Sequence, residues 1–172
     1  AHQPAEDDAG RAGWDDDPRV RRVRGVLGGA GFPTTISADI GGWLLGHAAF
    51  VVPIAFALYR TGVDATRLAA DRTTMRLMVL ATREAFTALR KDGNHQVSTN
   101  LRVLYCLPTV VVVAYWRRVL GGPRGELWFS GHCRAAPEEI RAMADELQGA
   151  LRRSDRATPH LDRLLTLGPE RP

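Results

Sequence analysis

His47 is the most prominent residue of this chain that could do chemistry, because it interrupts the apolar run WLLGHAAFVVPIAFALY at residues 43–59. Trp43 and Val51 are each four residues away from it, which places the three side chains on one face of a helix. An imidazole can act as a general acid or base near neutral pH. On an apolar face a histidine is more often a satisfied core residue. The run is therefore interpreted either as a buried helix or as the wall of a site.

A second group of reactive side chains lies in the stretch WFSGHCR, which holds Ser130, His132 and Cys133 and is expected to form a loop. A serine or cysteine beside a histidine could form a nucleophile and its base, but neither a GxSxG elbow nor a Cys–His signature supports that assembly. Glu139 follows Pro137 in the expected first turn of a helix, where an acid interacts favourably with the helix dipole.

The composition limits the class of protein. The chain has 172 residues, 45% of them hydrophobic and 24% charged, with a mean hydropathy of −0.17. These values predict one globular domain and exclude a multi-span membrane protein. The net charge is +4, but no basic stripe interleaved with aromatic residues indicates nucleic-acid binding. The two cysteines have no metal-ligand spacing, which favours a reduced, cytoplasmic chain without a metal site.

Helical patterns dominate the rest of the chain. Residues 1–17 are expected to form a disordered or acidic tail, and residues 18–38 a short helix followed by a short strand at FPTTIS. Residues 39–172 are expected to form an all-helical domain. Its helices are predicted at 40–59, from a cap at Asp64 to Lys91, from Ser98 or Thr99 to about 107, at 109–120, from Pro137 to about 153, and from a cap at Thr158 onward.

Two stretches favour other interpretations at first sight. Residues 40–59 contain no Asp, Glu, Lys or Arg and have the length of a membrane span, although three glycines, His47 and Pro53 weaken that interpretation. TVVVVAYWRRVL has the composition of a strand, but the preceding Pro108 and the following arginine and glycine pairs are typical of a buried helix.

The order of these pieces resembles the C-terminal part of ketopantoate reductases from about Asp17 to Leu165. The pieces are a helix ending in AG, the entry DIGGWLLGHAAFV, a long helix that contains Glu84, the segment PEEIRAM and the closing TPHLDRLL. The resemblance implies an all-α bundle similar to the C-terminal domain of 6-phosphogluconate dehydrogenase. In that family an N-terminal Rossmann domain binds NADP(H), and the 2-oxo group of ketopantoate is reduced between the two domains.

The resemblance also implies site residues. The family's general-acid lysine corresponds to His47, the asparagine one turn later to Val51, and the substrate-contacting glutamate to Glu139. Trp43, Ser130 and His132 are expected to contribute to substrate binding, although Ser130 is off the family's register. The change of asparagine to valine makes the expected pocket more apolar, which favours a larger or greasier substrate than ketopantoate, or no reduction at all.

Three functions follow as hypotheses. The first is the helical substrate domain of a ketopantoate-reductase-like oxidoreductase, in which NADP(H) is bound only if an upstream Rossmann domain supplies the site. The second is a stand-alone domain of secondary metabolism that uses His47 and Glu139 for cofactor-independent cyclisation or isomerisation. The third is a binding or oligomerisation module in which His47 is buried. The expected partners are a small-molecule substrate and a second copy of the chain, with neither nucleic acid nor membrane.

Overall fold

The computed structural model describes residues 17–37, 39–91, 93, 97–154 and 156–166. The chain divides into a unit of residues 1–41 and a unit of residues 42–172. Every regular element of the described residues is a helix, so the predicted all-α class is confirmed. The expected tail at residues 1–17 lies outside the described residues, apart from Asp17.

The first unit contains helix α2 (Pro18–Gly29), as predicted. The Asp17 side chain accepts a hydrogen bond from the Arg19 amide, and Pro18 starts the first turn. The strand predicted at FPTTIS is wrong, because residues 32–37 have no regular structure. A single stretch with β-propensity forms a strand only where a neighbouring strand pairs with it, and no strand occurs among the described residues.

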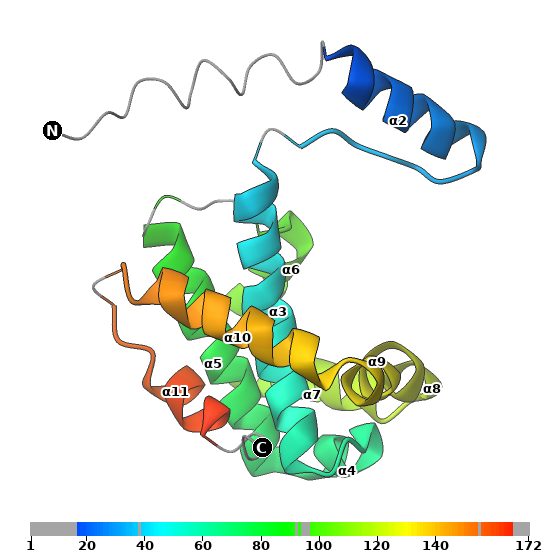
Figure 1. The fold of residues 1–172 in the computed structure, drawn as a ribbon. Helices are drawn as coiled ribbons and strands as arrows, with labels where there is room; N and C mark the ends of the chain where they lie inside the picture. The colour runs from blue at the N-terminus through cyan, green and yellow to red at the C-terminus, as the bar shows by residue number, and fades with distance from the viewer. Residues whose placement is uncertain (1–16, 38, 92, 94–96, 155, 167–172) are drawn as a thin grey trace, which may run out of the picture. The chain divides into compact units, whose positions relative to one another are not determined.

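The second unit is a bundle of helices arranged around α5 (Figure 1). The longer helices are α3 (Ile40–Arg60), α5 (Arg72–Lys91), α7 (Thr109–Leu120) and α10 (Pro137–Leu151). The shorter ones are α4 (Ala65–Ala70), α6 (Thr99–Cys106), α8 (Pro123–Gly125), the π-helical turn η2 (Glu126–Ser130), α9 (Gly131–Ala135) and α11 (Pro159–Leu165). Helix α11 packs along α5, and α7 packs against both α4 and α5.

The core forms where the apolar faces of these helices meet. Leu58, Met78, Leu147 and Leu164 are at most 1% exposed, and each comes from a different helix. The methionines of α5 therefore fill the core, which is the usual role of this flexible side chain. The run of four valines in α7 is helical, as the flanking residues predicted, because β-propensity yields to tertiary context.

The single helix predicted from Asp64 to Lys91 is interrupted at Asp71. Asp64 caps α4 as expected, through hydrogen bonds from the amides of Thr66 and Arg67. Asp71 ends α4 and caps α5, because its Oδ1 accepts the Thr73 and Thr74 amides, each at 3.0 Å. A carboxylate inside an apolar helical pattern was read as one exposed position, but it can satisfy free helix amides and start a new helix.

Two adjacent side chains of α5 connect it to distant segments. The Arg83 guanidinium donates to the Tyr105 carbonyl at 2.9 Å, to Thr109 Oγ1 at 2.7 Å and to the Leu107 carbonyl, so it holds the link between α6 and α7. Glu84 Oε2 accepts the amides of His160 at 2.8 Å and Leu161 at 3.1 Å. Glu84 therefore caps α11 from another helix.

The cap of α11 differs from the one expected. Thr158 occupies the residue before the helix, as predicted, but its side chain makes no capping hydrogen bond. Glu84 Oε1 also contacts His160 Nδ1 at 2.5 Å, so one carboxylate binds two amides and an imidazole. The Glu84 side chain is only 18% exposed, which strengthens these charge-assisted bonds.

Replacement of Glu84 should destabilise the bundle. Glu84→Ala leaves two amides of α11 without their acceptor, so we expect the free energy of unfolding to fall by about 1.5–3 kcal/mol. Glu146→Ala is the matched control, because Glu146 is exposed on α10, and it should change stability by less than about 0.5 kcal/mol. Urea unfolding followed by circular dichroism measures both variants. Equal stabilities of the two variants would contradict the role of Glu84.

The Asp71 cap should make stability depend on pH. Hydrogen bonds from the Thr74 hydroxyl and amide lower the pKa of Asp71 below its ordinary value of 3.8, and the Arg60 charge adds to the effect. Because the folded pKa is lowered, the ionised carboxylate stabilises the fold above about pH 4, and this contribution is lost as the pH falls through the folded pKa.

Asp71→Asn retains a capping oxygen but removes the charge. We expect it to lower the free energy of unfolding by about 0.3–1 kcal/mol at pH 7. The difference between the variant and the parent should shrink as the pH falls through the lowered folded pKa of Asp71, because both then carry an uncharged cap. Urea unfolding across this range tests the expectation, and a difference that stays constant with pH would refute it.

Candidate functional site

His47 lies on the solvent-exposed side of α3 and stacks on Trp43. The two rings are 5.3 Å apart between centroids and nearly parallel, with an interplanar angle of 4°. Both residues are exposed, and Trp43 retains 47% of its accessible surface. The interpretation of His47 as a buried core histidine is therefore wrong, and its imidazole is accessible to a ligand or a partner.

Helix α3 changes character along its length. From Val52 to Leu58 every residue is buried, whereas Ile40, Trp43 and Leu44 near its start are 47–58% exposed. The small residues Gly42, Gly46, Ala48 and Ala49 face the interior at this end. The first turns thus leave their large apolar side chains uncovered on one side, around His47.

The uncovered side of α3 leads to a group of aromatic rings on neighbouring helices. Phe50 follows His47 by three residues, so the two lie on the same side of the helix. The Phe50 ring is 5.5 Å from that of Trp116 in α7, and Trp116 is 6.0 Å from Phe129 in η2. The ring of Tyr115, which is 48% exposed, lies 5.3 Å from that of Trp116.

We call this area the α3 aromatic surface and define it by its exposed members. They are Trp43, Leu44 and His47. Soluble proteins rarely expose an apolar patch of this kind unless it binds a ligand or another protein surface. The surface is therefore the candidate site on the α3 side of the molecule.

The other predicted site residues differ in their accessibility. Val51 is partly buried and packs against the core, and Ser130 is completely buried at the end of η2. His132 and Glu139 are exposed, Glu139 in the first turn of α10. Within the described residues, no hydrogen bond or ion pair joins His47 to Glu139. Neither residue lines any of four cavities that occur there.

The stretch WFSGHCR is helical rather than a loop. Residues 126–130 form a π-helical turn and residues 131–135 the short helix α9. The chain passes close to the end of α7 just before η2, and this approach requires Gly125. A Cβ at that position would meet the Leu120 carbonyl oxygen at 2.1 Å. Ser130 and Gly131 indicated a loop, but they lie in the π-helical turn and in α9.

Cys133 is unsuited to nucleophilic chemistry. Its side chain is 4% exposed, and burial raises the pKa of its thiol to about 11. The Tyr59 hydroxyl donates to the Cys133 carbonyl at 3.2 Å, and burial raises the Tyr59 pKa to about 12. Both side chains therefore remain protonated at neutral pH, and a cysteine–histidine nucleophile is not formed here.

Some features of the site were missed by reading the sequence. The bond of His160 to Glu84 spans 76 positions of the chain. No local spacing reports such a contact, and Thr158 offered a plausible cap for α11 in the sequence. No group of three potential metal ligands occurs among the residues that the structure describes.

Comparisons with protein-family models, curated proteins and solved structures returned no match for the chain. Helix α3 is the one described helix long and apolar enough to cross a membrane by length and composition. Half of its most apolar window is buried inside the bundle, which is typical of a core helix as well. A core helix whose first turns are exposed would have such a half-buried window.

The two thiols should react differently. Cys106 is exposed and Cys133 is buried. At pH 8 a thiol with a pKa of about 11 is ionised only to about one part in a thousand. We therefore expect Ellman's reagent to modify one cysteine rapidly in the native protein and the second only after denaturation. Loss of the rapid phase in Cys106→Ser identifies the residue, and rapid reaction of Cys133 in that variant would contradict its burial.

Proposed function

We propose that the chain is the helical substrate domain of a ketopantoate-reductase-like oxidoreductase acting on a small 2-oxo acid or related carbonyl. The single observation that carries this proposal is the exposed His47–Trp43 stack at the edge of an uncovered apolar surface. In the family that the chain resembles, the substrate is reduced in the cleft between a cofactor domain and the helical domain. The proposal includes the finer fold assignment, a bundle like the C-terminal domain of 6-phosphogluconate dehydrogenase.

The contacts of the described chain support the resemblance at the level of the fold. Two of its motifs, the long helix with Glu84 and the closing TPHLDRLL, are joined by the hydrogen bonds from the amides of His160 and Leu161. The PEEI motif begins α10. Motifs that are weak one by one thus lie at the contacts and helix starts on which the bundle depends.

The proposed role of His47 is that of a general acid. When hydride reaches the carbonyl carbon of a 2-oxo acid, the oxygen becomes an alkoxide, and an imidazolium in contact with it can supply the proton. Stacking on Trp43 limits the rotation of the imidazole ring, which keeps the proton donor oriented. A cofactor domain that covered this surface would, with the apolar neighbours, exclude water and so strengthen this interaction.

NADP(H) would supply the hydride, and the described residues do not fit it. A dinucleotide site needs a strand, a glycine-rich turn and a helix in that order. Here Gly28 and Gly29 end a helix, and no strand occurs in the described segments. A separate domain would therefore hold the cofactor, and we expect the chain alone to leave NADPH unoxidised.

The two alternative functions receive less support. A stand-alone acid–base enzyme needs His47 and Glu139 around a shared cavity, whereas both are exposed and not bonded to one another. A module that pairs with a second copy would use the same α3 aromatic surface. That alternative predicts a dimer in solution that His47→Glu dissociates, as measured by light scattering.

Weak binding of the substrate class can be tested on the chain as it is. We expect titration with ketopantoate or 2-oxoisovalerate to shift amide NMR signals of the first turns of α3 and of neighbouring α7. His47→Ala should raise Kd about tenfold, a loss of about 1.4 kcal/mol. Arg118→Ala, which changes an exposed cation elsewhere on α7, is the control and should leave Kd unchanged. Absence of shifts at α3, or shifts confined to other helices, would refute the proposal.

A further inference from the structure

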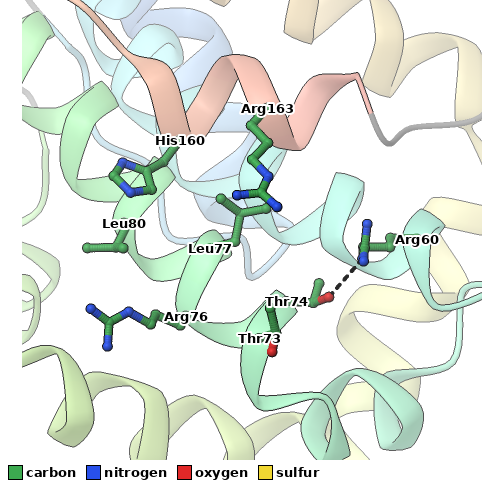
Figure 2. A pocket seen from close by; sticks show the side chains of 8 residues that line it. All are labelled: Arg60, Thr73, Thr74, Arg76, Leu77, Leu80, His160 and Arg163. Atoms are coloured by element: carbon green, nitrogen blue, oxygen red, sulfur yellow. Dashed lines mark hydrogen bonds between the residues drawn. The ribbon is translucent and has the colours of Figure 1, made fainter.

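A second concave site lies at the other end of α3, where this helix meets the first turns of α5 and the helix α11. It is a cavity of about 180 Å³. The cationic or titratable side chains that line it are Arg60, Arg76, Arg163 and His160 (Figure 2). No Asp or Glu is among its lining residues, and Figure 2 shows the guanidinium group of Arg76 pointing away from those of Arg60 and Arg163.

Arg60 is held in place by a short chain of hydrogen bonds. Its Nε donates to Thr74 Oγ1 at 2.9 Å, and the Thr74 hydroxyl donates to Asp71 Oδ2 at 2.6 Å. Thr74 is 1% exposed, so this relay is shielded from water. The relay occupies Nε and leaves both terminal nitrogens of the guanidinium available to an anion. Such pre-orientation reduces the entropic cost of binding.

Arg163 comes from the opposite wall. Figure 2 shows it reaching from α11 toward the wall of α5 that Leu77 and Leu80 form. No hydrogen bond or ion pair of its side chain occurs within the described residues. The position of α11, and with it that of Arg163, is set by the bonds from Glu84 to the amides of His160 and Leu161. The bundle thus positions the Arg163 guanidinium at the cavity without a hydrogen-bond or ion-pair partner among the described residues.

We propose that this cleft binds a phosphate group, as inorganic phosphate or as a small phosphate monoester. Donors from two helices, Arg60 of α3 and Arg163 of α11, approach from different directions, which suits a tetrahedral oxyanion better than a planar carboxylate. Guanidinium groups form bidentate hydrogen bonds with phosphate oxygens. The wall formed by Leu77 and Leu80 limits the access of water to these bonds. No Trp, Tyr or Phe lines the cavity, so it offers no platform for a nucleobase.

The cleft is separate from the α3 aromatic surface. Arg60 follows His47 by 13 residues, which corresponds to about 20 Å along the axis of α3. Phosphate binding at the cleft therefore does not rest on the proposed function. Its ligand could be a phosphorylated effector or the phosphate of a larger molecule that extends into solvent.

Calorimetric titration of the full chain with inorganic phosphate, glycerol phosphate and acetate tests the proposal. We expect saturable binding of either phosphate compound at low ionic strength and at least tenfold weaker binding of acetate. Arg163→Ala should weaken phosphate binding at least tenfold. Arg118→Ala removes the same charge from an exposed position of α7 outside the cleft and should retain the parent affinity.

Each other outcome overturns the proposal. Equal losses in Arg163→Ala and Arg118→Ala would show a diffuse charge effect rather than a site. Acetate as tight as phosphate would assign the cleft to carboxylates. No binding of either phosphate compound would leave the three arginines as solvated cations. Because Arg163 makes no internal hydrogen bond, its replacement should preserve the unfolding midpoint, which circular dichroism checks independently of binding.

Discussion

The pair Arg83–Glu84 on α5 is the constraint on which most of the bundle depends. Successive residues of a helix point about 100° apart, so one side chain reaches the link between α6 and α7 while the other reaches the start of α11. Rotation of α5 would break both sets of bonds at once. The hydrophobic core could tolerate several rotations of a helix, whereas these directional bonds select one of them.

Arginine has a recurrent structural use in this chain, beyond its effect on charge. Arg83 binds carbonyls at the end of α6, Arg117 donates to the Ala69 carbonyl at 2.7 Å, and Arg134 donates to the Val63 carbonyl at 3.0 Å. Each of these carbonyls lies at or near the end of a helix, where backbone acceptors lack intrahelical partners. A planar fork can serve two such acceptors together, which a lysine ammonium does less well. The three arginines of the cleft differ, because within the described part of the chain only Arg60 among them donates a side-chain hydrogen bond to a protein group, Thr74.

Local signals predicted the parts of the fold that depend on neighbouring residues. The starts of α2, α4, α6 and α10 follow Asp, Ser or Pro at the expected positions, and α7 was recognised from its flanks in spite of its valines. The break at Asp71, the helical stretch that contains Ser130 and the missing strand were not predicted. The break at Asp71 comes from a local cap that the helical periodicity does not reveal. The other two outcomes are decided by packing partners that are distant in the sequence or absent.

The candidate site was predictable only in part. The spacing of Trp43 and His47 placed them on one helix face, and their rings stack there. The same spacing does not tell whether that face is covered. An apolar stripe has the same sequence periodicity whether it is buried in a bundle or exposed on its surface. The arginine cleft could not be predicted for a related reason. Arg60, Arg76 and Arg163 belong to three helices, and they line one cavity only when α11 packs on α5.

The bond between Glu84 and α11 also has a consequence in time. During synthesis, Glu84 leaves the ribosome 76 residues before its partner His160. Until then α5 carries a carboxylate that no amide satisfies, beside an apolar groove that no helix covers. The nascent bundle therefore stays open until α11 is synthesised. During this interval its apolar surface is exposed, and exposed apolar surface is what chaperones bind.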